Sequence, residues 1–110
     1  MPKKFRVLWT DAATDDLDRI LEYIAARDSV DAAVRVFERL TGRIEGLSST
    51  PTRCRVVPEI REIGVTEFRE LLVGPYRIPF RIVANKVVLV GVLDGRRDLE
   101  EVLIERALAR

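Results

Sequence analysis

Five arginines and one glutamate lie between residues 68 and 97, where the chain reads FRELLVGPYRIPFRIVANKVVLVGVLDGRR. The guanidinium group of arginine is a planar fork of donors that suits the oxygens of phosphate or carboxylate groups. Arginine keeps its proton at any ordinary pH, so it can stabilise negative charge but cannot act as a general base. For proton transfer this region offers Glu70 and, before it, Glu59. The candidate binding residues are Arg69, Glu70, Arg77, Arg81, Arg96 and Arg97.

The composition excludes several kinds of chemistry. The chain has no histidine and a single cysteine, Cys54. It therefore cannot offer the usual zinc ligands, a histidine general base, or a Ser-His or Cys-His catalytic pair. A single cysteine also excludes a disulfide framework. We expect neither a metal site nor a cofactor.

The length of 110 residues predicts one domain, covering residues 1–110. Apolar residues make up 47% of the chain and charged residues 34%, which is typical of a folded globular protein rather than a disordered one. The N-terminus lacks the apolar core and cleavage site of a signal peptide, and no stretch is long enough to span a bilayer. We expect a cytoplasmic protein without a membrane partner.

The stretch from residue 68 to residue 97 predicts a three-stranded antiparallel meander. Two turn signals, Gly74-Pro75 and Asn85-Lys86, separate three apolar runs of strand length. Cross-strand partners follow from the position of each turn. The expected pairs are Leu72 with Arg77, Leu71 with Ile78, Ile82 with Leu89, and Arg77 with Asp94.

This pairing sorts the side chains of the meander onto two faces. One face is almost wholly apolar and should meet the rest of the protein. It carries Leu71, Val73, Tyr76, Ile78, Phe80, Ile82, Leu89 and Leu93. The other face mixes charged and apolar residues, so we expect something to bind there. It carries Glu70, Arg77, Arg81, Val88, Val90, Val92 and Asp94.

Two amphipathic helices are expected before the meander. Residues 5–9 predict a short strand, and Thr10 or Asp11 caps a helix with a buried apolar stripe and a solvated acidic face. Asp28 or Ser29 caps a second helix, which ends before Pro51 because proline cannot continue it. The short break forces the two helices into an antiparallel pair that should cover the apolar face of the meander. The stripe of the second helix is Val30, Ala33, Val34, Phe37, Leu40, Ile44 and Leu47.

The remaining segments complete the predicted fold. Residues 51–67 predict an irregular connection with a short strand at residues 55–57. A last helix should run from Leu99 to about Ala109, with Asp98 as its cap and Glu101 answering it three residues later. The predicted class is α+β in the order β-α-α-β-β-β-α: an antiparallel sheet with a two-helix hairpin packed on one face and a short C-terminal helix.

This order of elements, with the residues in it, resembles the RelE/ParE superfamily of type II toxin-antitoxin toxins. The resembling residues are Trp9-Thr10, Ala13, Asp16-Leu17, Ile20, Tyr23-Ile24, Val57-Pro58-Glu59, Arg69-Glu70-Leu71, Tyr76-Arg77-Ile78, Phe80-Arg81 and Gly95-Arg96-Arg97-Asp98-Leu99. They span nearly the whole chain. The resemblance implies a small bacterial protein that poisons its own cell when free and is held inactive in a complex with a cognate antitoxin.

The resemblance leaves the cellular target open. ParE-like members poison DNA gyrase so that it leaves broken DNA behind. RelE-like members are endoribonucleases that cleave mRNA in the ribosomal A site, using basic residues around the scissile phosphate and a tyrosine or similar acid/base near the C-terminus. A third alternative is a non-toxic protein that only binds its antitoxin and helps repress their shared promoter.

Residues carried over from RelE-like members favour the ParE-like alternative. Arg77 matches an arginine on the family's strand, and Arg97 matches an arginine after the last strand. If the chain cleaved RNA, its catalytic residues would be Arg77, Arg81 and Arg97. The tyrosine position, however, falls near Leu103, which cannot transfer a proton.

The same arginines could have structural roles instead of the catalytic ones. Arg77 opposite Asp94 is equally explained as a cross-strand ion pair, whereas Arg81 has no obvious partner within the sheet. Arg96 and Arg97 are equally explained as solvated loop charges. A disordered antitoxin tail that carries acidic and apolar residues would also fit the mixed face of the meander.

Overall fold

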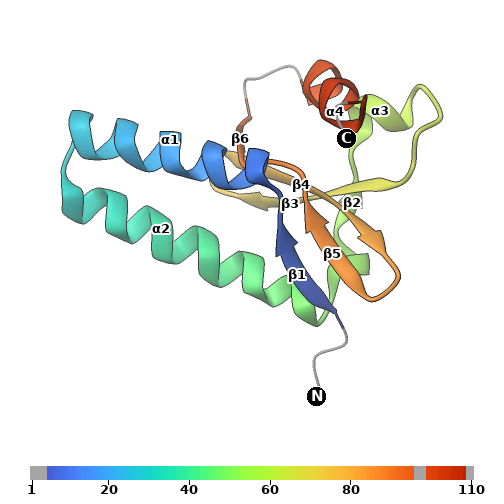
Figure 1. Ribbon diagram of the computed structural model, residues 1–110, viewed down its shortest axis with the longest axis horizontal. Coiled ribbons are helices and arrows are strands. Elements are labelled where there is room, and N and C mark those ends of the chain that lie inside the picture. Colours follow the sequence, from blue (N-terminus) through green and yellow to red (C-terminus); the bar gives the residue numbers. More distant parts are fainter. Residues whose placement is uncertain (1–4, 96–98, 109–110) are drawn as a thin grey trace.

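A computed structural model describes residues 5–95 and 99–108 of the chain. It confirms the predicted α+β class, with the helical hairpin and the short C-terminal helix in the predicted order (Figure 1). The elements are β1 (Arg6–Trp9), α1 (Asp11–Arg27), α2 (Val30–Glu45), the 3₁₀ turns η1 (Gly46–Ser48) and η2 (Pro51–Arg53), β2 (Arg55–Val56), α3 (Pro58–Arg61), β3 (Phe68–Val73), β4 (Tyr76–Val83), β5 (Lys86–Leu89), β6 (Leu93–Asp94) and α4 (Leu99–Leu108). The predictions made for Arg96, Arg97 and Asp98 lie outside the described residues. Among the described helices, none has both the length and the apolar character needed to cross a membrane.

The helical hairpin begins at the predicted caps. Thr10 caps α1, because its Oγ1 accepts a hydrogen bond from the backbone N–H of Ala13 at 3.2 Å. The same hydroxyl donates to the carbonyl oxygen of Leu89 at 2.8 Å and so ties the start of α1 to the end of β5. Ser29 caps α2 by accepting from the N–H of Ala32 at 3.0 Å. The break between the helices is short, so they run antiparallel, as Figure 1 shows.

The sheet is mixed, which corrects the expectation of a wholly antiparallel sheet. Its strand order is β1-β5-β4-β3-β2, and β6 pairs with β4. β1 runs parallel to β5, whereas the other described pairs are antiparallel. A parallel pair needs a long crossover connection. Here the helical hairpin, β3 and β4 all lie between the two partners in the chain, so local turn signals could not reveal the pairing.

The first turn of the meander has the predicted register. Leu71 faces Ile78, and Leu72 faces Arg77. Gly74 in this turn has φ +56°, a left-handed conformation that glycine adopts without steric cost. The order of side chains on β3 and β4 is therefore as predicted.

The second turn lies one residue earlier than predicted. It uses Ala84 and Asn85 instead of Asn85 and Lys86, so Val83 faces Lys86. As a result Ile82 faces Val87 and not Leu89, and Arg81 faces Val88. The partner changes by two residues, and a change of two leaves every side chain of β5 on its predicted face.

An extra residue after β5 exchanges the faces of the next two apolar side chains. Phe80 faces Leu89 on β5, whereas Arg77 faces Leu93 on β6. Residues 90–92 therefore lie opposite residues 78–79 of β4, an arrangement typical of a β-bulge. Pro79 lies at this point, where proline is tolerated in a sheet, and its carbonyl accepts a hydrogen bond from Val90 N at 2.8 Å.

Because of the bulge, the sequence-based predictions for Val92, Leu93 and Asp94 are wrong. Leu93 lies on the same face as Arg77, whereas Val92 joins the core under the helices. Asp94 faces Tyr76 and not Arg77. A one-residue offset reverses every side chain that follows it, and nothing in the apolar run VVLVGVL shows where such an offset occurs.

Two apolar clusters lie on opposite faces of the sheet. The α1–α2 hairpin covers the first face, where the buried members are Ala13, Leu17, Leu40, Ile44, Leu47, Leu71, Val73, Ile78, Phe80, Val87, Leu89 and Val92. The second cluster is built with α3 and α4, which lie together away from the hairpin in Figure 1. Its buried members are Val57, Ile60, Phe68, Leu93, Leu99, Val102 and Leu103. The second face of the sheet, on which we expected a partner to bind, is thus partly covered by α3 and α4 of the same chain.

The apolar stripe of α2 is only partly buried, contrary to the prediction that it lies wholly in the core. Ala33, Leu40 and Ile44 are buried, but Val30, Val34 and Phe37 are 68%, 46% and 43% exposed. The hairpin extends beyond the sheet in Figure 1, so the early part of α2 has no sheet beneath it.

Asp16 is a buried carboxylate on α1, which corrects the prediction of a wholly solvated acidic face. Its Oδ2 accepts hydrogen bonds from Arg106 Nη1 at 2.7 Å and from the backbone N–H of Val92 at 3.0 Å. Its Oδ1 accepts from Arg106 Nη2 at 3.1 Å. A Cβ on Gly91 would collide with Arg106 Nη1 and lie 3.0 Å from Asp16 Oδ2. The pair therefore joins α1, the bulge and α4.

We predict that Asp16→Asn lowers the free energy of unfolding by about 3 kcal/mol, because it leaves the Arg106 guanidinium without its buried counterion. Urea denaturation followed by circular dichroism measures this change. Asp15→Asn removes the same charge from an exposed neighbour and should change stability by less than about 0.5 kcal/mol. Equal effects of the two variants would contradict a structural role for the pair.

Candidate functional site

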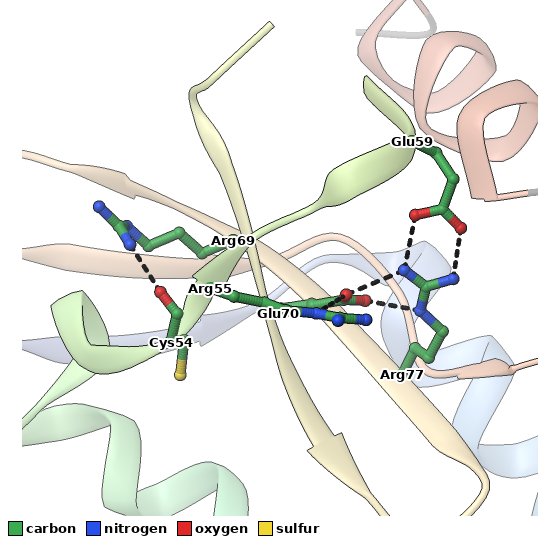
Figure 2. Close-up of polar contacts among 6 residues, drawn as sticks. All are labelled: Cys54, Arg55, Glu59, Arg69, Glu70 and Arg77. Carbon is green, nitrogen blue, oxygen red and sulfur yellow. Dashed lines mark hydrogen bonds and ion pairs between the residues drawn. The ribbon is translucent and has the colours of Figure 1, made fainter. Parts of the chain in front are cut away.

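Arg77 is the centre of an ionic cluster on the second face of the sheet. All three nitrogens of its guanidinium donate to carboxylates, as Figure 2 shows. Nε and Nη2 donate to Glu70 Oε1 and Oε2 at 2.6 and 2.9 Å, whereas Nη1 and Nη2 donate to Glu59 Oε2 and Oε1 at 2.5 and 2.8 Å. The Arg77 guanidinium, which the sequence suggested as a phosphate-binding group, therefore donates to two carboxylates, one at each of two edges of its plane.

The two carboxylates differ in their surroundings. Glu70 on β3 has a fully buried side chain, and its Oε2 also accepts from Arg55 Nε at 2.7 Å. Glu59 on α3 is 36% exposed at its side chain, and Arg77 itself is 13% exposed. Glu70 is thus an internal counterion between two arginines, whereas Glu59 closes the cluster on its solvent side.

Short elements position this cluster. β2 pairs with β3 so that Arg55 lies directly opposite Glu70. α3 begins at Pro58, directly after Val57, and Val57 and Ile60 on either side of Glu59 are buried in the second apolar cluster. The segment predicted as irregular from the sequence therefore places Arg55 against Glu70 and Glu59 against Arg77.

The cluster shifts the pKa values of two of its members. The hydrogen bonds from Arg77 hold the pKa of Glu59 below its ordinary value, although partial burial opposes this. Hydrogen bonds to Glu59 and then Glu70 raise the pKa of Arg77 above its ordinary value. Both groups are therefore charged at neutral pH, and each is a poor proton carrier.

The other predicted site residues are not all brought to this cluster. Arg81 lies on the same face and pairs at 3.2 Å with Glu67, which lies just before β3 and outside the sheet. Arg69 lies on the opposite side of β3 and donates from Nη1 to the carbonyl oxygen of Cys54 at 2.6 Å. Figure 2 shows Arg69 directed away from Arg77. Arg96 and Arg97 lie outside the described residues.

Sequence reasoning missed a second surface, at the edge of the sheet. An open groove of about 810 Å³ lies between β1 and α2. It is lined by Phe5, Arg6, Val7, Trp9, Phe37, Thr41, Ile44, Glu45, Ser48 and Asn85. We call this groove, together with the exposed Val30, Val34 and Phe37, the α2–β1 surface. The signal for it was present in the apolar stripe of α2, but the whole stripe was assigned to the core.

We predict that Glu70→Gln lowers the free energy of unfolding by about 3 kcal/mol, because Arg55 and Arg77 then lack their buried counterion. Glu59→Gln should cost less than about 1 kcal/mol, because a partly exposed ion pair contributes little. Thermal or urea unfolding of the two variants measures the difference. A larger loss for Glu59→Gln than for Glu70→Gln would contradict the division into an internal counterion and a solvent-side partner.

Comparison with known proteins agrees with this architecture. The sequence model of the ParE toxin of type II toxin-antitoxin system, parDE, matches residues 7–99. Toxin ParE3 of Caulobacter vibrioides is 29% identical over 94 residues, which cover 86% of this chain and 90% of that protein. A chain of the structure described as the chromosomal ParDE TA system from P. aeruginosa has the same fold, with a TM-score of 0.71 at 18% identity over 83% of this chain and 96% of its own. The chain therefore belongs to the ParE toxin family of type II toxin-antitoxin systems.

Proposed function

We propose that this chain acts by poisoning DNA gyrase, rather than by cleaving mRNA, and that a cognate antitoxin holds it inactive in the cytoplasm. Gyrase poisoning is the activity that the resemblance implies for ParE-like members, and the chain belongs to that family. The observation that favours gyrase poisoning over RNA cleavage is that the Arg77 guanidinium is already hydrogen-bonded to two carboxylates. A ribonuclease of the RelE type needs such a fork free for the scissile phosphate, but here four hydrogen bonds from it go to Glu59 and Glu70.

The described residues near the cluster are also poorly suited to proton transfer. RNA cleavage needs a base for the 2′-hydroxyl and an acid for the leaving oxygen. The lowered pKa of Glu59 makes it a weak base. Burial, with a smaller contribution from the charge of Asp94, raises the pKa of Tyr76, whose ring packs against the core under the helices. Leu103, near the expected tyrosine position, is 1% exposed in the second apolar cluster.

The cysteine offers no alternative nucleophile. Burial raises the pKa of the Cys54 thiol, although the charges of Arg69 and Arg43 act in the opposite direction. A thiol with a raised pKa is mostly protonated at neutral pH, and the thiolate is the reactive form. The chain thus acts most simply by binding its target, which is what poisoning of a topoisomerase requires.

The α2–β1 surface is our candidate for the antitoxin contact. It combines an exposed apolar stripe with an adjoining groove, and large exposed apolar patches mark sites of protein association. The face predicted from the sequence offers less to a partner, because Glu70 is fully buried and Arg77 is mostly buried between carboxylates. Arg81 remains accessible there at 27% of its side chain and stays a candidate for contact with the target.

We expect purified toxin to trap gyrase on cleaved plasmid DNA and to leave messages intact on programmed ribosomes. Plasmid linearisation after denaturation of gyrase, and primer extension on the message, measure the two activities. Prior addition of the cognate antitoxin should abolish the gyrase signal. Ribosome-dependent cleavage without a gyrase signal would overturn the proposal, and silence in both assays with normal antitoxin binding would favour the non-toxic co-repressor.

We predict that Phe37→Glu weakens binding of the cognate antitoxin at least about tenfold, because a charge would have to be buried in the apolar contact. Isothermal titration calorimetry measures the affinity. Thr14→Glu adds the same charge at an exposed position of α1 and should leave the affinity within about twofold. If both variants bind equally well, the antitoxin does not use the α2–β1 surface.

A further inference from the structure

We propose that Arg77 is a phosphate-binding site masked by the chain itself, and that Glu59 is the residue that masks it. The ligand class is the phosphodiester of a nucleic-acid strand. Glu59 then acts as a specificity-determining residue that keeps nucleic acid away from the second face of the sheet. The inference shares the Arg77 contacts with the proposed function but does not depend on which target the toxin poisons.

The first step is the geometry of the fork. Glu59 presents two carboxylate oxygens to Arg77 Nη1 and Nη2 at 2.5 and 2.8 Å. Phosphate presents two oxygens to a guanidinium in the same side-by-side manner. The carboxylate of Glu59 therefore occupies the position that a bidentate phosphate would take.

The second step is the unequal burial of the two carboxylates. Glu70 is fully buried and shared with Arg55, so it holds Arg77 in place whatever lies on the other edge. Glu59 is 36% exposed and lies on the neighbouring edge of the Arg77 fork, as Figure 2 shows, with Nη2 donating to both carboxylates. A ligand could reach the edge held by Glu59 from solvent, whereas the edge held by Glu70 is closed.

The third step is the charge of the cluster. Arg55 and Arg77 are matched by Glu59 and Glu70, and Arg81 is matched by Glu67. The described face is therefore close to neutral despite its arginines. Binding of nucleic acid depends on neutralising phosphates with unmatched cations, so loss of the Glu59 charge leaves one unmatched cation at a preformed fork.

The fourth step is the support beneath Glu59. Val57 and Ile60 are buried at 0% and 2% exposure, and Val57 N donates to Phe68 O at 3.0 Å. These contacts hold α3 against the sheet without help from the Glu59 side chain. A substitution at Glu59 should therefore open the fork and leave its surroundings in place.

The test compares binding of a short fluorescein-labelled oligouridylate to the wild-type chain and to Glu59→Gln by fluorescence anisotropy. We expect Glu59→Gln to bind about tenfold more tightly at low salt, because one charge-assisted fork becomes available. The gain should fall as salt rises, with a slope that corresponds to about one additional phosphate contact. Glu62→Gln is the matched control, because it removes the same charge from the same segment and Glu62 is not a partner of Arg77.

A double variant separates the fork from net charge. Glu59→Gln with Arg77→Lys keeps the charge of Glu59→Gln but lacks the planar fork, so most of the gain should disappear. Equal binding by Glu59→Gln and Glu62→Gln, or full retention of the gain in the double variant, would overturn the proposal. Circular dichroism checks folding. If both Glu59→Gln and Glu59→Ala failed to fold, Glu59 would be a structural partner and not a mask, which would also overturn it.

Discussion

A carboxylate that is removed from water must meet a cation and hydrogen-bond donors, or it destabilises the fold by several kcal/mol. Two carboxylates in this chain meet that condition, Glu70 under the second face of the sheet and Asp16 beneath the bulge. Glu70 is bonded to Arg77 on the neighbouring strand, and Asp16 is bonded to Arg106, 90 residues away in the sequence. Among the described residues every buried polar side-chain atom has a partner. The arrangement of α4 depends on the second of these pairs, whereas α3 is held by its buried apolar side chains. α3 carries the second acid to Arg77, and α4 carries Arg106 to Asp16.

The same constraint explains why the described arginines on the second face of the sheet, Arg55, Arg77 and Arg81, are each matched by an acid. An arginine on a half-buried strand can bind a separate anionic ligand or a carboxylate of its own chain. Pairing within the chain avoids the loss of translational and rotational entropy that binding a separate ligand entails. In this chain the internal choice is made at Arg77 and also at Arg81. The exposed apolar area of the described chain lies elsewhere, along α2 and β1.

Local signals in the sequence were sufficient for much of the fold. The caps at Thr10 and Ser29 and the turn at Gly74 each depend on side-chain chemistry within a few residues, and all three were predicted. The bulge after β5 and the parallel pairing of β1 were not predictable, because they follow from packing between segments far apart in the chain. A shift of strand register within a continuous apolar run leaves the local sequence pattern unchanged, so the sequence alone does not reveal it.

The ionic cluster shows the same division at the level of the site. Arg77, Glu70 and Glu59 could each be named as chemically important from the sequence, but their mutual contacts could not. The pairing of Arg77 with Asp94 was a reasonable expectation from an unbroken meander, and the bulge removed it. The role of Asp16 was hidden for another reason, because an acid on an amphipathic helix is most often solvated.

The pairing of β1 with β5 also has a consequence for the newly made chain. The hydroxyl of Thr10 and the carbonyl of Leu89, which join the two strands' ends, are 79 residues apart in sequence. During synthesis the N-terminal strand must wait until residues 86–89 have left the ribosome before it can take its place in the sheet. The α2–β1 surface includes that strand, so it is completed only after β5 has been made. A nascent toxin therefore lacks its finished α2–β1 surface until that point of its translation.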